Sequence, residues 1–286
     1  MASTKLQNLH THTVFGDGRN TAEETVRAAI AAGCGSLGFS EHSRMPAAVA
    51  SGWCMTEAEE AAYRQEVLRL REAYAGQIEL FLGLERDLDA LPSPEPYEYI
   101  IGSVHGVWRN GVYLPVDASQ AEFCRAVQER YAGDYFAFIR DYYQREASVV
   151  LSTRCQIVGH FDLVTKFNEG GRLFDEADPR CREASLGALE ALSKQDVVFE
   201  INTGAISRNC RTVPYPSDFL LRSLRGFGGR VCISSDSHSA STITFGFVQA
   251  AELALSCGFR ETYLLTRDGF HAVGLEEFRD AAKRRT

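Results

Sequence analysis

The sequence predicts an α/β barrel, and three observations support this fold class. The chain has 286 residues, of which 45% are hydrophobic, enough to bury one large core. Short apolar segments alternate with helical segments about seven times, which is typical of parallel strands joined by helical crossovers. Reactive side chains follow most of the apolar segments, and barrel enzymes have their active sites at the carboxyl ends of the strands. We therefore expect residues 1–286 to form a single domain.

Two other arrangements remain open. A chain of this length could also form two smaller domains. An open doubly wound sheet would show the same alternation of strands and helices, but it concentrates its site at one switch point. Because the reactive side chains follow most of the predicted strands, the barrel is favoured.

The first half of the chain is divided by capping residues and turn residues. Asn20 or Thr21 can cap a first helix that ends before Gly33, and Thr56 can begin a second helix that reaches residue 74. The interval 91–96 is rich in proline and is expected to be a loop. The expected strands are 5–9, 35–39, 77–82 and 97–101.

The second half begins with a long helical segment. Apolar and aromatic residues, Phe123, Val127 and Tyr131 among them, recur at helical spacing over residues 119–148, so we expect one or two long helices with these residues in the core. Helices are also expected at 180–193 and 247–257. The remaining expected strands are 156–158, 197–202, 230–234 and 262–265.

The overall composition excludes several kinds of partner. A formal net charge of -8 argues against a nucleic acid or an anionic membrane surface as the main partner. The eight cysteines form no CxxC pair, so we interpret them as buried or idle thiols. Neither a signal-like amino terminus nor an apolar run of about 18 residues is present. These features predict a cytoplasmic protein without a membrane segment, and they leave the oligomeric state open.

Six of the seven histidines directly follow a predicted strand. His10 and His12 are one residue apart, so in extended backbone they point the same way and can bind one ion. His271 lies outside this pattern and is interpreted as structural. Imidazoles and carboxylates suit zinc, iron or manganese, and the number of candidates predicts two or three divalent ions. The candidate metal ligands are His10, His12, Asp17, His42, Glu85, His105, His160, Asp236 and His238.

The order of these motifs resembles the polymerase-and-histidinol-phosphatase (PHP) superfamily. The motifs are HxH followed by Asp-Gly, then Ser-Glu-His, Gly-Leu-Glu, Gly-Ser-Val-His-Gly, Gly-His-Phe-Asp and Ser-Asp-Ser-His, over residues 8–240. Within them, residues 100–105 and 159–168 resemble the histidinol-phosphate phosphatase branch in particular. The resemblance implies a distorted (β/α)7 TIM-like barrel with a trinuclear metal centre at the C-terminal ends of its strands.

The resemblance also implies how the ligands are shared among three ions. Glu85, with two oxygens, would be the natural bridge between the first two sites. Some relatives have histidine at the position of Asp17, so the metal preference of the third site stays open. His10, His12, Glu85 and Asp236 would hold one ion, Glu85, His105 and His160 a second, and Asp17, His42 and His238 the third.

A phosphate monoester is the expected substrate. Three divalent ions carry more positive charge than Glu85, Asp17 and Asp236 neutralise, so the pocket should attract phosphate in an otherwise acidic protein. The hypothesis is that a metal-bound hydroxide, held through Glu85, His105 and His160, attacks phosphorus in line while the alcohol leaves.

Basic side chains should complete the phosphate site, because arginine offers a planar fork that matches phosphate oxygens. Arg208 is the first candidate, Lys166 the second and Arg44 the third. Asp162 and Glu200 are candidates for orienting ligand histidines, and a helix cap or an ion pair is the alternative for each.

The leading functional hypothesis is histidinol-phosphate phosphatase, which releases L-histidinol and phosphate in histidine biosynthesis. The nearest alternative is a PHP phosphoesterase for another small phosphate ester or a nucleotide, because the loops 44–56 and 205–216 give little information on the alcohol. A metal-dependent amidohydrolase would normally have a bridging lysine where this chain has Glu85. A non-catalytic scaffold would normally lack some of the ligands, and here all nine candidates are present.

Overall fold

Seven parallel strands form the centre of the molecule, in the spatial order β1-β2-β3-β4-β7-β8-β9. The structure is a computed structural model that describes residues 6–49, 52–93 and 95–285. Lys5 of the expected first strand and Pro94 of the expected loop lie outside these ranges. The predicted parallel α/β architecture is confirmed. The strands are β1 (Leu6–Asn8), β2 (Cys34–Phe39), β3 (Glu79–Asp87), β4 (Tyr99–Ser103), β7 (Ile157–Val158), β8 (Val198–Asn202) and β9 (Arg230–Ser234).

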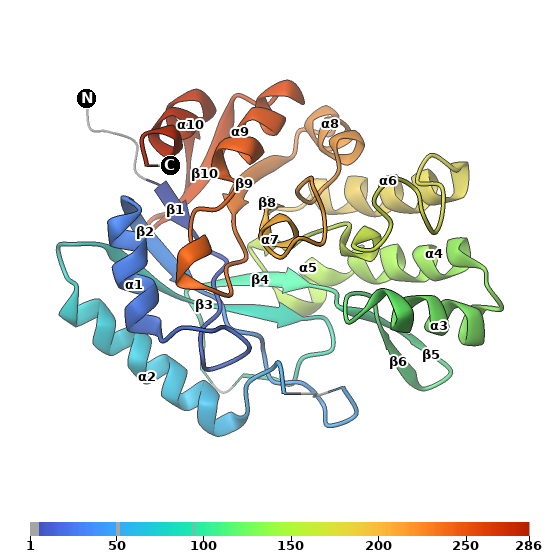
Figure 1. The fold of residues 1–286 in the computed structure, drawn as a ribbon, viewed down its shortest axis with the longest axis horizontal. Helices are drawn as coiled ribbons and strands as arrows, with labels where there is room; N and C mark the ends of the chain where they lie inside the picture. Colours follow the sequence, from blue (N-terminus) through green and yellow to red (C-terminus); the bar gives the residue numbers. More distant parts are fainter. Residues whose placement is uncertain (1–5, 50–51, 94, 286) are drawn as a thin grey trace.

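The sheet curves into a barrel, and its two edge strands, β1 and β9, face each other across a seam (Figure 1). The contacts across this seam differ between the two ends of the strands. At the C-terminal ends, the backbone amide of Ser237 donates to His10 O at 3.0 Å, and the amide of His12 donates to Ser237 O at 2.8 Å. At the other end, β10 (Glu261–Thr266) packs beside β9, and the Gln7 side chain bonds the backbone N and O of Leu265 at 2.7 and 2.8 Å. The barrel is therefore distorted at this seam.

Helices cover the outside of the barrel (Figure 1). Thr21 and Thr56 cap α1 and α2 through capping boxes, as their sequence neighbours predict. None of the helices in the described part of the chain is both long and apolar enough to span a bilayer. The helices are α1 (Ala22–Ala31), α2 (Glu57–Ala73), α3 (Gln120–Tyr131), α4 (Tyr135–Glu146), α5 (Val149–Thr153), α6 (Pro179–Ser193), α7 (Gly204–Ser207), α8 (Asp218–Gly226), α9 (Phe247–Ser256) and α10 (Leu275–Lys283), with 3-10 turns η1 (Leu163–Thr165) and η2 (Ala240–Thr242).

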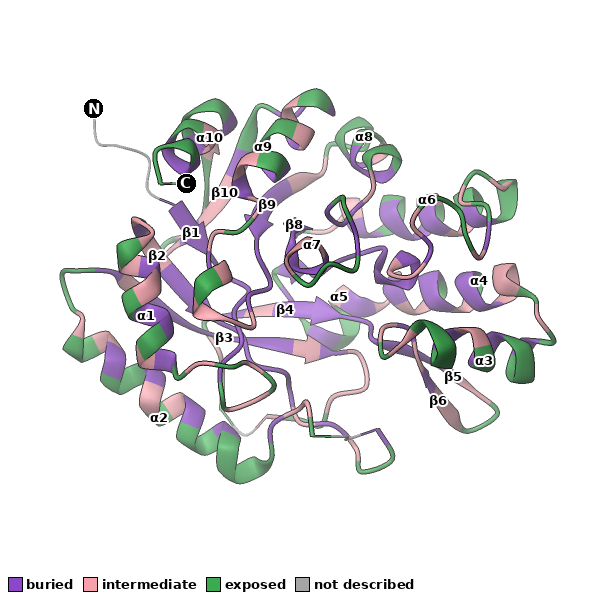
Figure 2. Ribbon diagram, in the orientation of Figure 1, coloured by how far each residue is buried: buried purple, intermediate pink, exposed green. Residues whose placement is uncertain are grey.

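Tyr99 fills the barrel interior beneath the ends of the strands. The strands are buried along most of their length (Figure 2), and the Tyr99 hydroxyl lies 2.5 Å from Leu9 O and 2.9 Å from Phe39 O. A Cβ atom on Gly38 or Gly83 would approach the Tyr99 side chain to 2.2 Å, so both strands need glycine at these positions. This close packing of the barrel interior holds the strand ends that carry the site in fixed positions.

The expectation of one or two helices over residues 119–148 is confirmed, since α3 and α4 are separated where Ala132 and Gly133 adopt positive φ angles of 53° and 81°. Two features differ from the sequence-based expectations. A hairpin of β5 (Gly106–Arg109) and β6 (Val112–Pro115) was not expected, although Asn110 and Gly111 in its turn are the preferred residues for a tight hairpin turn. The predicted strand near residues 262–265 pairs antiparallel with β11 (Gly269–Gly274) outside the parallel sheet. None of the eight cysteines forms a disulfide bond, as expected.

Candidate metal centre

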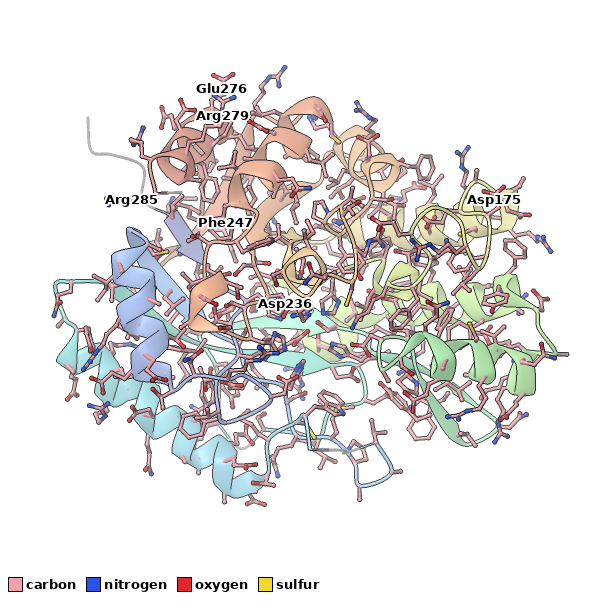
Figure 3. All side chains as sticks on the ribbon, in the orientation of Figure 1. Asp175, Asp236, Phe247, Glu276, Arg279 and Arg285 are labelled. Atoms are coloured by element: carbon pink, nitrogen blue, oxygen red, sulfur yellow. The ribbon has the colours of Figure 1, made fainter. Side chains whose placement is uncertain are left out.

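The nine candidate metal ligands meet at the C-terminal ends of the strands. Asp236, which is labelled in Figure 3, lies near the middle of the molecule. Seven of the nine residues are buried, and only Asp17 and His238 are more open to solvent. His10, His12 and Asp17 follow β1, His42 follows β2, Glu85 lies in β3, His105 follows β4, His160 follows β7, and Asp236 and His238 follow β9.

Glu85 lies at the centre of this group. One of its carboxylate oxygens, Oε2, is 3.2 Å from His10 Nε2, 3.5 Å from His12 Nε2 and 2.8 Å from His42 Nδ1. The other oxygen, Oε1, is 2.9 Å from His160 Nε2 and 3.4 Å from His105 Nε2. The two oxygens therefore face two different sets of imidazoles, which is the arrangement that a bridging carboxylate requires.

Two further carboxylates extend the group. Asp236 Oδ1 lies 3.6 Å from His10 Nε2 and 3.4 Å from His12 Nε2. Asp17 Oδ1 lies 3.2 Å from His238 Nε2 and 3.7 Å from His42 Nε2. Two ligand atoms that bind one tetrahedral ion at about 2.0–2.1 Å are about 3.3 Å apart, so these separations suit a shared ion.

The hydrogen bonding of the imidazoles shows whether a cation fits between these atoms. His10 Nδ1 is 2.7 Å from Glu200 Oε2, and His105 Nδ1 is 2.9 Å from Asp87 Oδ2. A carboxylate accepts the Nδ1 hydrogen of each ring, so Nε2 faces Glu85 and can present a lone pair to a cation once its own proton is released. His10 Nε2, both ring nitrogens of His12, and Glu85 Oε2 are buried without a hydrogen-bond partner among the described residues. Buried acceptors that face acceptors are costly unless a cation lies between them, so the site fits divalent ions.

The charge states of these groups favour the same conclusion. Burial alone would raise the pKa of Glu85. The neighbouring His42 and His10 lower it by a larger amount, so the pKa of Glu85 is well below its usual value. Burial likewise opposes ionisation of Asp236, and Arg208 and His10 overcome it. Burial, followed by His238 and His42, lowers the pKa of His12 to about 3. The carboxylates are therefore charged and His12 is neutral, which are the metal-binding forms. Although burial lowers the pKa values of His10, His42 and His105, the neighbouring carboxylates raise them by more, so a metal ion must displace a proton from these rings.

The residues that orient the histidines were only partly anticipated. Glu200 contacts His10, as proposed from the sequence. The same proposal for Asp162 is wrong, because Asp162 Oδ2 accepts the backbone amide of Ser217 at 2.9 Å, next to the start of α8. Asp87, which holds His105, was missed, although it lies two residues after Glu85 and so shares its face of the strand.

A cavity of about 530 Å³ opens onto the candidate metal centre and contains two of the three predicted phosphate-binding residues. Arg208 lines it, with Nη2 2.9 Å from Asp236 Oδ2. Lys166 also lines it and donates to the backbone oxygen of Asp117 at 2.9 Å. Arg44 does not line the cavity. Its Nε lies 2.6 Å from Oε2 of the buried Glu60, so this ion pair takes the place of the expected phosphate contact.

Several other cavity-lining side chains were not predicted. Trp53 places its ring 4.9 Å from that of His42 and 5.7 Å from that of His105. Asp117 and the aromatic residues Tyr113 and Tyr215 also line the cavity. They come from loops and a hairpin whose paths have no periodic sequence signal.

Comparison with known proteins identifies relatives over most of the chain. The PHP domain family model matches residues 8–204. A Deinococcus radiodurans protein named "Probable histidinol-phosphatase" is 29% identical over 270 residues, which cover 90% of this chain and 95% of that protein. The Bacillus subtilis "Histidinol-phosphatase" is 24% identical over 260 residues, which cover 83% and 95%.

Solved structures share the fold. A protein from Listeria monocytogenes superposes with a TM-score of 0.73 at 18% identity, covering 85% of this chain and 99% of that one. Histidinol phosphate phosphatase from Lactococcus lactis, solved with zinc, L-histidinol and phosphate, has a TM-score of 0.69 at 22% identity, covering 93% and 99%. The family match spans more than half of the sequence and includes the candidate ligands from His10 to His160, so the chain belongs to the PHP domain family.

Proposed function

We propose that this protein is a metal-dependent phosphomonoesterase that hydrolyses L-histidinol phosphate to L-histidinol and inorganic phosphate. The names of the Deinococcus radiodurans and Bacillus subtilis relatives, which match nearly their full length, support this substrate. The Lactococcus lactis structure of similar fold contains zinc, L-histidinol and phosphate, and it supports the same assignment. The small-molecule ester would bind in the cavity at the C-terminal ends of the strands.

The observation that carries this proposal is the arrangement around Glu85. Five imidazoles approach its two oxygens within 3.5 Å, and Asp236 and Asp17 supply further oxygen ligands on either side. Zinc, iron and manganese all accept such mixed nitrogen and oxygen ligands. A buried cluster of metal ligands that opens onto a cavity large enough for a small molecule suits metal-assisted hydrolysis.

We assign the ligands to three sites. The first site uses His10, His12, Glu85 and Asp236, and the second uses Glu85, His105 and His160. The third uses Asp17, His42 and His238, with His12 Nδ1 4.0 Å from Asp17 Oδ1. Asp17 is the most exposed of the nine, so the third site is expected to exchange its metal most readily.

The residues around these sites have separate tasks. Divalent ions bound there would activate water near neutral pH and stabilise negative charge on the phosphate oxygens. Glu200 and Asp87 fix the tautomers of His10 and His105, so that each Nε2 stays available as a ligand. Arg208, beside Asp236, is placed to contact a phosphate oxygen in the cavity, and Lys166 is the second basic group there.

The proposal is tested by phosphate release from L-histidinol phosphate, measured beside sugar phosphates, nucleotides and p-nitrophenyl phosphate, with metal content determined on the same sample. We expect kcat/KM to be highest for L-histidinol phosphate and to fall on chelation and return with added zinc or manganese. Preference for another ester would contradict the substrate and retain the phosphoesterase. Full activity without bound metal would contradict the proposed chemistry.

A further inference from the structure

Arg211 is a buried arginine that lies behind the cavity wall and has no part in the chemistry described so far. It is 6% exposed and is not among the residues that line the cavity. Its Nη1 donates to the backbone oxygen of Thr165 at 3.2 Å and also to the Thr165 hydroxyl oxygen. The guanidinium carbon lies 4.7 Å from the centre of the Tyr215 ring, and Nε is buried without a hydrogen-bond partner among the described residues.

These contacts are a poor source of stability. Burying a charge costs free energy, and the neutral oxygens of Thr165 offset only part of that cost. An apolar side chain of similar volume often fills such a space without loss of stability. The reason for an arginine at this position therefore lies in the segments that it connects.

Arg211 joins two segments of the cavity wall. Thr165 ends η1, in the segment that follows β7, and the next residue, Lys166, lines the cavity. Arg211 belongs to the segment between β8 and α8, and Arg208, three residues earlier, lines the same cavity. The backbone amide of Arg211 donates to Ala205 O at 3.2 Å, which closes the turn that bears Arg208. The contact between Arg211 and Thr165 therefore fixes the distance between the turn of Arg208 and the turn of Lys166.

We propose that Arg211 is a positioning residue that sets the spacing between the two basic side chains of the phosphate site. This inference rests on the proposed function, because it takes Arg208 and Lys166 as the phosphate contacts. Two cations bind one phosphate group well only when both reach its oxygens at once. A change in their spacing therefore lowers phosphate affinity even when both side chains are intact.

The test compares Arg211→Met with the wild-type holoenzyme. Methionine can still pack on Tyr215, but it cannot donate a hydrogen bond to Thr165. We expect KM for L-histidinol phosphate and for p-nitrophenyl phosphate to rise about tenfold, with kcat changed less than about twofold. The Kd of inorganic phosphate, measured by calorimetry, should rise by the same factor. A merely structural role would reduce the amount of active enzyme, which lowers kcat and leaves KM unchanged.

Two control variants separate this contact from general effects of substitution. Arg222→Met makes the same change on the exposed face of α8 and should leave KM and kcat unchanged. Thr212→Val removes a second contact between the same two segments, in which the Thr212 hydroxyl donates to Glu169 Oε1 at 2.7 Å. Thr212 is exposed, so water competes for this hydrogen bond, and the variant should change the Kd of phosphate less than about twofold.

A double variant shows whether Arg211 acts through the basic side chains. In a Lys166→Ala background the spacing of two cations no longer matters, so Arg211→Met should raise the Kd of phosphate by less than about twofold. A full tenfold loss in that background, or an unchanged Kd in Arg211→Met alone, would overturn the inference and leave the proposed function intact. A wild-type enzyme that neither hydrolyses the esters nor binds phosphate would overturn the proposed function and this inference together.

Discussion

Glu200 and His10 form a buried pair in which His10 Nδ1 lies 2.7 Å from Glu200 Oε2. The same carboxylate accepts hydrogen bonds from the His160 amide at 2.8 Å, the Asn202 side chain at 2.7 Å and the Ser234 hydroxyl at 2.7 Å. Burial alone would raise the pKa of Glu200, but His10 lowers it by a larger amount. The carboxylate is therefore ionised and accepts all four hydrogen bonds. One side chain thus fixes the ends of β7, β8 and β9 around the first histidine of the centre.

Glu200→Ala should weaken metal binding without removing any proposed ligand. His10 would lose the acceptor that fixes its tautomer, and such outer contacts are typically worth about 10- to 100-fold in metal affinity. Competition with a chelator measures the change directly. Asp162→Asn is the control, because Asp162 bonds Ser217 rather than a histidine, and its metal affinity should equal that of the wild type.

The Glu85→Gln substitution should lower kcat by more than about 100-fold. Loss of a bridging metal ligand should have a larger effect than loss of a residue that only contacts a ligand. The fold should remain, since the barrel interior around Tyr99 is packed independently of Glu85. Metal analysis and circular dichroism on the same sample separate the two effects. A variant that keeps its activity after metal depletion would refute the ligand assignment.

Arg208→Ala should raise KM for the phosphate ester and the inhibition constant of inorganic phosphate, each by about tenfold, through loss of a charged hydrogen bond. Steady-state kinetics at fixed metal content provide the measurement. Because Arg208 also contacts Asp236, metal content must be shown to be unchanged. If both constants stay at their wild-type values, the phosphate contact belongs to Lys166 instead.

Arg44→Ala should affect stability rather than catalysis. The substitution removes the charged partner of the buried Glu60 carboxylate, which keeps the hydrogen bond from the Tyr97 hydroxyl at 2.7 Å, and this loss should cost about 1–3 kcal/mol of unfolding free energy. kcat/KM of the folded enzyme should not change, because Arg44 lies outside the cavity lining. Adding Glu60→Gln should restore part of the stability, and a double-mutant cycle by denaturant unfolding measures that coupling.

Glu146→Gln should change how stability depends on pH. Glu146 is fully buried, its Oε1 accepts the Tyr142 hydroxyl at 2.8 Å, and burial raises its pKa well above the usual 4.5. The folded protein therefore keeps this proton at pH values where the unfolded chain has lost it. In the wild type, this group lowers the unfolding free energy by about 1.4 kcal/mol per pH unit from about 4.5 up to the folded-state pKa.

Glutamine cannot ionise, so Glu146→Gln should gain stability relative to the wild type between pH 5 and pH 8. Urea unfolding at both pH values measures the gain, and both proteins share the same metal centre, so the difference isolates Glu146. Glu129→Gln, on the exposed face of α3, is the control and should follow the wild type. Parallel pH profiles for Glu146→Gln and the wild type would show that Glu146 ionises in the folded state.

The barrel and the group of nine side chains could be predicted because both depend on strand ends. A parallel strand has a clear apolar signal, and the residues that follow it converge at one edge of the sheet, so His42 and His160 could be placed near Glu85 without a structure. Asp87 could have been found by the same rule. The turn at Asn110 and Gly111 was also readable as a hairpin signal.

Other features depend on contacts that sequence spacing does not encode. Arg44 follows a candidate ligand closely, yet α2 brings the buried Glu60 against it. Asp162 lies two residues after His160 but turns toward the start of α8. Asp117 and Tyr215 reach the cavity from segments without periodicity, so only the folded chain shows that they share one surface with the metal centre.

The bond between Gln7 and Leu265 joins residues that are 258 positions apart, and it closes the seam of the barrel. During synthesis, β1, which precedes His10 and His12, leaves the ribosome before its neighbours at the seam, β9 and β10. Asp236 and His238 can therefore join His10 and His12 only after the chain has been made through β9. Capture of a full set of ions by this centre therefore follows the synthesis of β9 and cannot guide the folding of the strands made before it.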